Sequence, residues 1–246
     1  MENCLQLDIG NSSAKWRLVA GGQIISRGRY SERDADSLDA LLACADSLDQ
    51  ILISSVASEE RELELGKHLA RRWSLQPWFA RTEQSTGRLQ SCYVEPARMG
   101  VDRWLAMLGA IEHRSGRVAV IDAGSALTID IVAESGQHEG GYIIPGPELM
   151  ERSLLKDTDR VRFAESTDYR LQPGQSTAEA VRNGIAAAQA GAVALVLQDL
   201  EIGFNQAIFC GGGSPVLMRL LDCDSDYVPD LVFEGLELMA AIRKTG

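Results

Sequence analysis

Two segments of this chain follow the same pattern, and this internal repeat limits the possible folds more than any other feature. The first reads LQLDIGNSSAKWRLV from residue 5, and the second reads VAVIDAGSALTIDIV from residue 118. Each is an apolar run that ends in Asp, followed by a turn with Gly and a hydroxyl residue and then by a second apolar run. Asp8 and Asp122 are 114 positions apart (122 − 8), close to half of the 246 residues. The repeat therefore predicts an α/β fold made by duplication, with two related halves that face a central cleft.

The periodicity of apolar residues predicts which elements surround the two repeats. Short β-rich runs predict strands, and apolar residues at helical spacing predict helices. In the first half we expect strands at 3–8, 14–20, 23–29, 51–56 and 75–80, helices at 36–46 and 58–72, and irregular chain at 81–99. In the second half we expect helices at 100–114, 176–200 and 230–243 and strands at 118–122, 126–134 and 206–210. The predicted domains are residues 1–98 and residues 99–246.

The charge and the cysteines exclude several classes of function. The formal net charge is −11, which argues against nucleic acid or an acidic membrane as a partner, because both attract clustered Lys and Arg. We expect no membrane span and no signal peptide, so the predicted location is the cytoplasm. Five scattered cysteines without a CxxC pair and three isolated histidines favour neither a disulfide framework nor a transition-metal site.

The first turn, over residues 8–13, has the chemistry of a phosphate-binding loop. Its glycine lets backbone N–H groups approach phosphate oxygens, and its amide and hydroxyl side chains add uncharged donors. Lys15 adds a positive charge if the strand alternation turns it toward the same face, and Asp8 is suited to hold a magnesium ion. An ordinary hairpin with Asx-turn hydrogen bonds is the alternative interpretation.

The second turn and a later glycine loop repeat this chemistry. Residues 122–128 read DAGSALT, and residues 211–214 read GGGS after an apolar run. Two such turns, each after a buried strand, would hold a polyphosphate from both sides. The glycine loop would let the backbone approach the nucleotide, although a tight strand-to-helix turn explains it as well.

Five motifs, in this order, extend from the start of the chain to beyond residue 176. They are Asp8–Lys15 (DxGN(T/S)xxK), Gly100–Arg103 (GxDR), Asp122–Ala126 (DxGTA), Gly140–Gly146 (GGxIxPG) and Ser176–Ala180, a helix start that contains Thr. Together they resemble the type III pantothenate kinases of the acetate/sugar kinase, Hsp70 and actin superfamily. The resemblance implies a duplicated actin-like (ribonuclease H-like) fold. It also implies transfer of the ATP γ-phosphate to the 4'-hydroxyl of pantothenate, the first step of coenzyme A biosynthesis.

The resemblance assigns roles to the substrate-binding residues. Asp102 is similar to the general base, which would take the proton from the attacking hydroxyl. Arg103 is similar to the residue that pairs with the pantothenate carboxylate, and a surface salt bridge is its alternative role. Thr177 is similar to a threonine that reaches the substrate from the partner subunit, and a helix N-cap is its alternative. The implied substrate-binding set is Tyr93, Gly100, Val101, Asp102, Arg103 and Thr177.

The resemblance also implies the ATP and cation sites. Asp122 is similar to the ligand of a monovalent cation, K+ or NH4+, and Asp8 would hold the Mg2+ that accompanies ATP. Ser12 and Ser125 stand where the family often or usually has Thr. Each keeps the hydroxyl donor but is less rigid, so we expect a modest weakening of ATP binding. The implied ATP-binding set is Asp8, Ile9, Gly10, Asn11, Ser12, Ser13, Ala14, Lys15, Ser125 and Gly212.

Two alternative functions and one assembly state complete the expectations. A kinase of the same fold for another small molecule is disfavoured because acetate and sugar kinases lack the GVDR element. A non-catalytic nucleotide-binding regulator is disfavoured because Asp8, Asp102, Arg103 and Asp122 are all retained. The resemblance implies a homodimer, for which the small-residue stretch at 186–194 offers a helix face, unless this helix packs only within its own chain.

Overall fold

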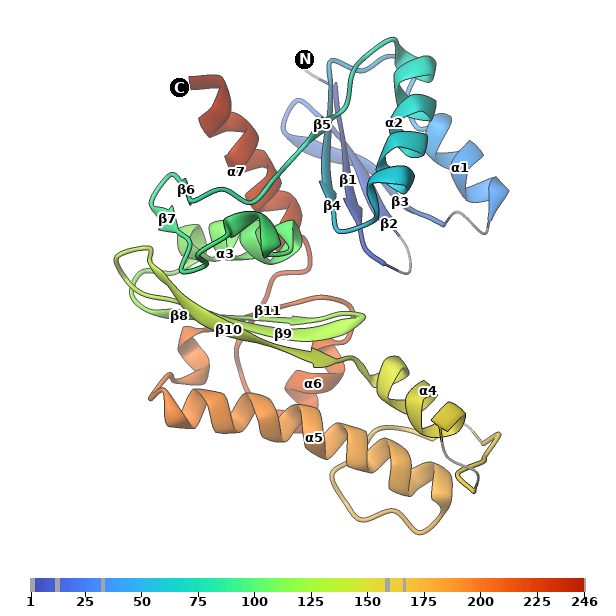
Figure 1. Cartoon of the computed structure of the whole chain (residues 1–246), viewed down its shortest axis with the longest axis vertical. Helices are drawn as coiled ribbons and strands as arrows, with labels where there is room; N and C mark the ends of the chain where they lie inside the picture. The colour runs from blue at the N-terminus through green and yellow to red at the C-terminus, as the bar shows by residue number, and fades with distance from the viewer. Residues whose placement is uncertain (1–2, 12–13, 32–33, 158–159, 166, 246) are drawn as a thin grey trace. The chain divides into compact units, whose positions relative to one another are not determined.

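The computed structural model describes residues 3–11, 14–31, 34–157, 160–165 and 167–245, and they form two compact units (Figure 1). The first unit combines residues 1–109 with residues 231–246, and the second holds residues 110–230. The predicted domains follow the order of the chain, whereas the compact units do not. The difference arises because the last helix packs with the first unit.

The first unit is a five-stranded sheet with helices on both faces. The strand order is β3-β2-β1-β4-β5, with β1 antiparallel to β2 and parallel to β4. Its elements are β1 (Asn3–Ile9), β2 (Ala14–Ala20), β3 (Gln23–Tyr30), α1 (Ala35–Leu42), β4 (Gln50–Ser55), α2 (Glu59–Trp73), β5 (Trp78–Phe79), β6 (Ser85–Thr86), β7 (Leu89–Gln90), a 3-10 turn at Pro96–Arg98, α3 (Val101–His113) up to Gly109, and α7 (Leu231–Thr245).

The two faces of this sheet differ in polarity. Leu5, Leu7 and Ile9 of β1 are buried in the apolar core with Leu41 of α1 and Leu69 of α2. The intervening residues of β1 and β2 point to the other face, as the two-residue period of a strand requires. α1 and α2 cover the apolar face, and α7 lies on the opposite side of the sheet (Figure 1).

The second unit repeats the topology of the first. Its strand order is β10-β9-β8-β11-β12, with β8 antiparallel to β9 and parallel to β11. The order and the strand directions match those of the first sheet, which confirms the predicted duplication. Its elements are β8 (Val118–Ala123), β9 (Ala126–Val132), β10 (His138–Pro145), α4 (Pro147–Asp157), α5 (Thr177–Asp199), a 3-10 turn at Phe204–Gln206, β11 (Ala207–Cys210), α6 (Ser214–Leu221) and β12 (Asp226–Tyr227).

Helix α5 bears on the expectation that the chain has no membrane span. By length and composition alone, Thr177–Asp199 is apolar enough to cross a membrane, which the sequence analysis did not note. Ala190, Val193 and Leu197 of this helix are buried against the second sheet. The apolar composition of α5 is therefore explained by its packing in the core of its unit.

Candidate active site

Asp8 lies near the end of β1, and the first unit surrounds it with polar groups. Ser54 on the neighbouring strand donates a hydrogen bond to Asp8 Oδ1 at 3.1 Å. Lys15 is the cross-strand partner of Asp8 on β2, so the strand alternation turns Lys15 toward the same face. Burial, and then the Asp102 carboxylate, raise the pKa of Asp8 from 3.8 to about 6, while Lys15 and Ser54 act to lower it. A partly buried carboxyl with a raised pKa is a natural ligand for a divalent cation, which relieves the cost of its charge.

The rest of the first turn is described only in part. Asn11 is exposed at its tip, and its backbone oxygen accepts a hydrogen bond from Arg61. The predicted donors Ser12 and Ser13 lie outside the described residues.

The GVDR motif forms the start of α3 and places Asp102 near Asp8. The backbone N–H of Arg103 donates to Asp102 Oδ1 at 2.8 Å. A Cβ at Gly100 would stand 2.5 Å from that same oxygen. The motif therefore needs glycine at this position, because any side chain would displace the carboxylate that we expect to act as base.

Arg103 and Tyr93 form a preorganised pair beside this carboxylate. The guanidinium donates to the Tyr93 hydroxyl at 3.1 Å and lies 5.9 Å from the centre of its ring. Arg103 is only 6% exposed, so its alternative role in a surface salt bridge does not fit. A buried guanidinium with an aromatic partner is suited to bind a carboxylate with two hydrogen bonds.

The second turn joins β8 to β9, and the GGxIxPG motif supports it. Ser125 is exposed at the tip of the turn. The N–H of Gly146 donates to the Ser125 carbonyl at 3.1 Å, and a Cβ at Gly146 would stand 2.4 Å from that oxygen. The Pro145 carbonyl accepts a hydrogen bond from Gln189 of α5 at 3.0 Å. The sequence analysis assigns no role to this motif. In the structure, its last glycine holds the second turn in place.

The glycine loop lies against the same turn. Gly211 has a φ of +82°, and a Cβ there would stand 2.1 Å from Asp122 Oδ1. The N–H of Gly213 donates to the Ala123 carbonyl at 2.8 Å. A Cβ at Gly212 would have no atom within 4 Å. The loop is therefore fixed at both ends by the second turn and open at Gly212, the residue predicted to approach ATP.

The surroundings of Asp122 are rich in oxygen. Asp122 Oδ1 and the Ala123 carbonyl both lie close to Gly211, and the Tyr227 hydroxyl donates to the Gly211 carbonyl at 3.4 Å. Burial, followed by Cys210, Asp230 and Asp122, raises the pKa of Tyr227. Carboxylate and carbonyl oxygens are the ligands that hard cations prefer, so these residues fit a monovalent cation. Sequence reasoning did not find Tyr227, because it comes from β12, more than 100 positions after Asp122.

No group of three or more His, Cys, Asp or Glu side chains suited to a metal occurs among the residues that the structure describes. Among these described residues, a cation would therefore have at most two such side chains, with backbone oxygens, water or the phosphates of a nucleotide as further ligands.

Thr177 begins α5, but it is not the N-cap of that helix. Ser176 is the cap residue, and its hydroxyl accepts from the backbone N–H of Glu179 at 3.2 Å. Thr177 is exposed. Its side chain is not needed to cap the helix and remains accessible at the surface.

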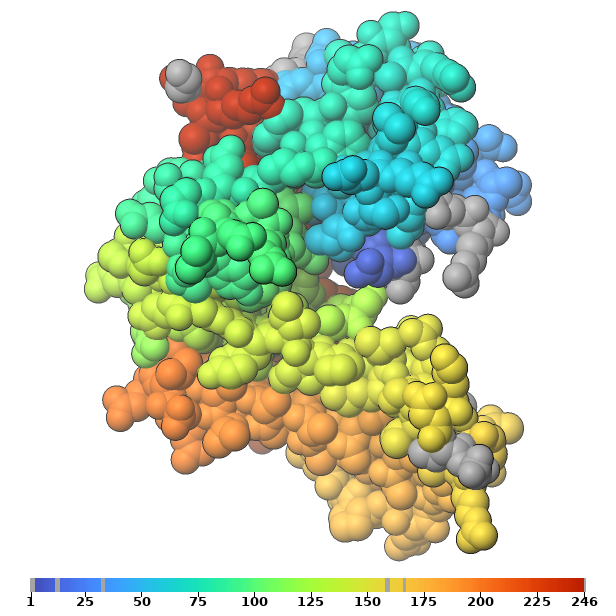
Figure 2. All heavy atoms as spheres, in the orientation of Figure 1, coloured from blue at the N-terminus to red at the C-terminus, as the bar shows by residue number. Residues whose placement is uncertain are grey.

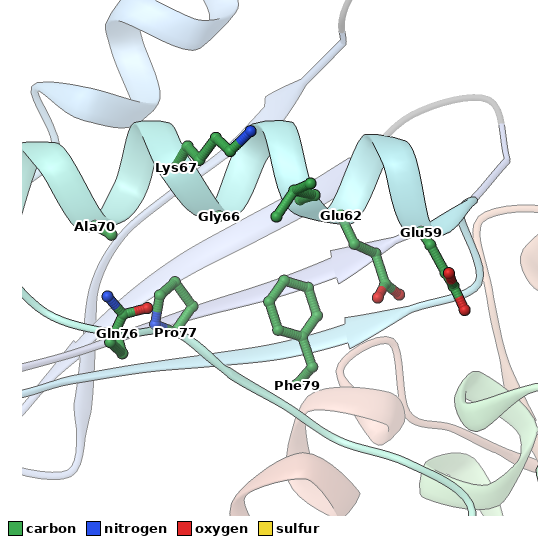
Figure 3. Close-up of a pocket in the computed structure, with 9 residues that line it drawn as sticks. Glu59, Glu62, Gly66, Lys67, Ala70, Gln76, Pro77 and Phe79 are labelled. Atoms are coloured by element: carbon green, nitrogen blue, oxygen red, sulfur yellow. The ribbon is translucent and has the colours of Figure 1, made fainter.

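A groove on the first unit holds none of the predicted site residues. It has a volume of about 360 Å³ and lies between α2 and the segment around β5 (Figure 3). Apolar Phe79 and the carboxylates of Glu59 and Glu62 line it.

The duplicated sheets, each with the same strand order, define a class of protein, those of the actin-like fold. A solved structure of MreB 5 from Spiroplasma citri bound to AMPPNP matches this fold with a TM-score of 0.54. The match covers 100% of this chain and 98% of that one at 12% identity. At this identity the similarity establishes the fold alone.

Sequence comparisons identify the family within this class. Residues 4–199 match the family model for type III pantothenate kinase. The type III pantothenate kinase of Marinobacter nauticus is 36% identical, with 96% of this chain and 98% of that protein covered. The one of Pseudomonas savastanoi pv. phaseolicola is 38% identical, with 97% and 99% covered. The chain belongs to the type III pantothenate kinase family.

Proposed function

We propose that this chain transfers the γ-phosphate of ATP to the 4'-hydroxyl of pantothenate, giving 4'-phosphopantothenate in the first step of coenzyme A biosynthesis. Its family membership over nearly the whole chain makes it an ATP-dependent pantothenate kinase. One observation carries the assignment of the site: the Asp102 carboxylate lies close enough to Asp8 to raise its pKa. A candidate base and a candidate metal ligand therefore meet in one unit.

Asp102 is proposed as the general base. It begins α3, is partly buried, and is held by the Arg103 backbone N–H. Phosphoryl transfer has a loose transition state, so the hydroxyl needs orientation more than a strong base. A fixed carboxylate meets that need, because it accepts the hydroxyl proton while it aims the oxygen at the γ-phosphate.

Arg103, Tyr93 and the backbone of Gly100 and Val101 are proposed to bind pantothenate. The buried guanidinium would pair with the substrate carboxylate, and the Tyr93 hydroxyl would hold the guanidinium in place. A charge-assisted, bidentate pair in a buried site gives both affinity and orientation. Removing either partner should therefore raise the KM for pantothenate more than the KM for ATP.

ATP is proposed to contact residues of both turns and of the glycine loop. In the first unit these are residues 8–15, and in the second they are Ser125 and Gly212. As a kinase, the chain uses ATP with a divalent metal, and we propose Mg2+ with Asp8 as a ligand. Such an ion neutralises charge on the phosphates. We propose K+ or NH4+ at Asp122, where the nearby Ala123 carbonyl would add an oxygen ligand.

We propose a homodimer in which α5 meets a partner and Thr177 reaches the partner's substrate. One face of α5 packs in the core, while Ala187, Ala188, Gly191 and Leu195 on the other face are exposed. Leu195 is 66% exposed, and α5 forms part of the open surface (orange in Figure 2). Small residues let a second helix approach closely. The proposed location is the cytoplasm, with neither nucleic acid nor a membrane as a partner.

The test is ADP release by the purified chain with ATP, Mg2+ and pantothenate, in K+ and again in Na+. Asp102→Asn should lower kcat by about 100-fold or more, since general bases contribute factors of this order. The matched control is Asp39→Asn, an exposed carboxyl on α1. Turnover indifferent to pantothenate would favour a kinase for another small molecule. ATP binding without turnover on any small alcohol would favour the regulator.

A further inference from the structure

A polar cluster joins the C-terminal helix to the hairpin that carries the first turn; its Arg17 end is buried and its Glu237 end is exposed to solvent. Arg17 on β2 is buried, and its Nε donates to Gln6 Oε1 at 2.6 Å. Its NH2 group lies 3.0 Å from Glu237 Oε1 on α7. Gln6 Nε2 donates to the same Glu237 oxygen at 2.7 Å. The guanidinium also lies 4.7 Å from the centre of the Phe233 ring, again on α7.

The same helix is in direct backbone contact with α3. A Cβ at Gly235 of α7 would stand 1.9 Å from the Leu105 carbonyl oxygen. A Cβ at Gly109 of α3 would stand 2.8 Å from the Leu231 carbonyl oxygen. Each helix thus provides a glycine where the two backbones cross, so the distance between them is set by the backbones themselves.

These contacts are a few residues from the reacting groups. Gln6 and Arg17 are cross-strand partners, as are Asp8 and Lys15 two residues further along the hairpin. Leu105 lies about one helical turn after Asp102 on α3. α7 is therefore attached to the hairpin that bears Asp8 and to the helix that bears Asp102, and it passes beside both (red in Figure 1).

We propose that Arg17 and Glu237 are positioning residues for phosphoryl transfer. Their cluster fixes α7 against the hairpin, and α7 in turn fixes the place of Asp102 relative to the first phosphate turn. Neither residue touches substrate in this proposal. A shift of the base by about 1 Å lowers the rate by up to about a hundredfold. Loss of the Arg17–Glu237 contact should therefore lower kcat. The inference rests on the proposed function, in which Asp102 is the base.

A role in stability alone predicts something different, because an ion pair whose carboxylate is exposed to solvent adds little to stability. Arg17→Met keeps the length and the apolar stem but removes all the hydrogen bonds of the guanidinium. Glu237→Gln keeps an oxygen that accepts from both Arg17 and Gln6, so it serves as the conservative variant. Leu69→Ala on α2 is the matched control, because it opens the core on the opposite face of the sheet.

The experiment compares steady-state kinetics of the full-length variants at a temperature where each is folded. Arg17→Met should lower kcat about 10- to 100-fold and leave both KM values within about threefold. Glu237→Gln should retain most of the activity, and Leu69→Ala should lower stability without lowering kcat. Equal loss of kcat in Arg17→Met and Leu69→Ala, when the two are equally destabilised, would overturn the proposal.

A double-mutant cycle separates positioning from any general effect. In an Asp102→Asn background there is no base to position, so Arg17→Met should have little further effect on the residual rate. Independent, multiplicative losses would refute the positioning role. If the unmodified chain turns over no pantothenate, the proposed function itself fails. If the unmodified chain turns over pantothenate but the two substitutions lower the rate independently of each other, only this inference fails.

Discussion

The raised pKa of Asp8 makes a quantitative prediction about stability. The group titrates near 6 in the folded chain against 3.8 when it is free. Between these values the folded protein binds a proton that the unfolded chain has already lost. Stability therefore falls as the pH rises through this window, and it levels off above the folded pKa.

The size of this effect follows from the two pKa values. Integrating proton binding by both states between about pH 5 and about pH 7.5 gives a loss of about 1.4 kcal/mol in the free energy of unfolding. Asp8→Asn resembles the protonated form, so it should lack this component. Relative to the unmodified chain, the variant should gain about 1.4 kcal/mol over the same pH range.

Urea denaturation at both pH values, without ATP and divalent metal, measures this difference. Asp39→Asn on α1 removes the same charge from an exposed position and corrects for general charge effects. Added Mg2+ should reduce the pH dependence of the unmodified chain if Asp8 binds it. Parallel stability curves for Asp8→Asn and the unmodified chain would refute the argument, because they would show that folding does not desolvate this carboxyl.

Three further substitutions test separate parts of the structure. Gly211→Ala should lower the free energy of unfolding, measured in urea, by at least about 2 kcal/mol, because Gly211 has a left-handed φ and a Cβ there would meet a carboxylate oxygen. A change below about 0.5 kcal/mol would contradict the loop geometry. Gly146→Ala should raise the KM for ATP about tenfold by displacing the second turn, with less effect on the KM for pantothenate; an unchanged KM for ATP would contradict this. His138→Ala should cost about 3 kcal/mol in thermal or urea unfolding, because it leaves the buried Asp130, 3.0 Å away, without this partner; a neutral result would show that water replaces the ring.

The features that the sequence predicts well are local ones. Each repeat pairs an apolar strand with its return strand through a short turn, so its hydrogen bonds join residues that are close in the chain. The two sheets accordingly form where the pattern predicts. The order of their strands then confirms that the halves are duplicates, which no composition argument could show.

The elements that the sequence analysis missed have weak periodic signals. α4 buries none of its residues, so no apolar stripe marks it. In β10 the register shifts between His138 and Gly140, and Ile143 is 65% exposed, which removes the alternation of a half-buried strand. The strand expected at 75–80 is paired only at Trp78–Phe79, because Pro77 carries no N–H to donate.

The candidate site was predictable as residue types but not as an arrangement. The carboxylates Asp8, Asp102 and Asp122 follow from motifs whose chemistry is readable from the chain. The reason for Gly100 is a contact with Asp102 Oδ1, and the reason for Gly146 is a contact across 21 positions (146 − 125). Tyr227 comes from a different strand altogether. The Gly100 contact is local to its motif, whereas those of Gly146 and Tyr227 depend on the tertiary fold, which the spacing of the motifs does not encode.

The interrupted first unit has a consequence for the order in which the molecule is made. Residues 110–230 are continuous, so this unit is available to fold as soon as it has left the ribosome, while the earlier unit still lacks α7. Until residues 231–245 emerge, Arg17 lacks its contacts with Glu237 and Phe233, and α3 lacks its glycine contacts with α7. The part of the protein that is synthesised first is therefore completed last, and under our proposal a nascent chain acquires its aligned base only with that final helix.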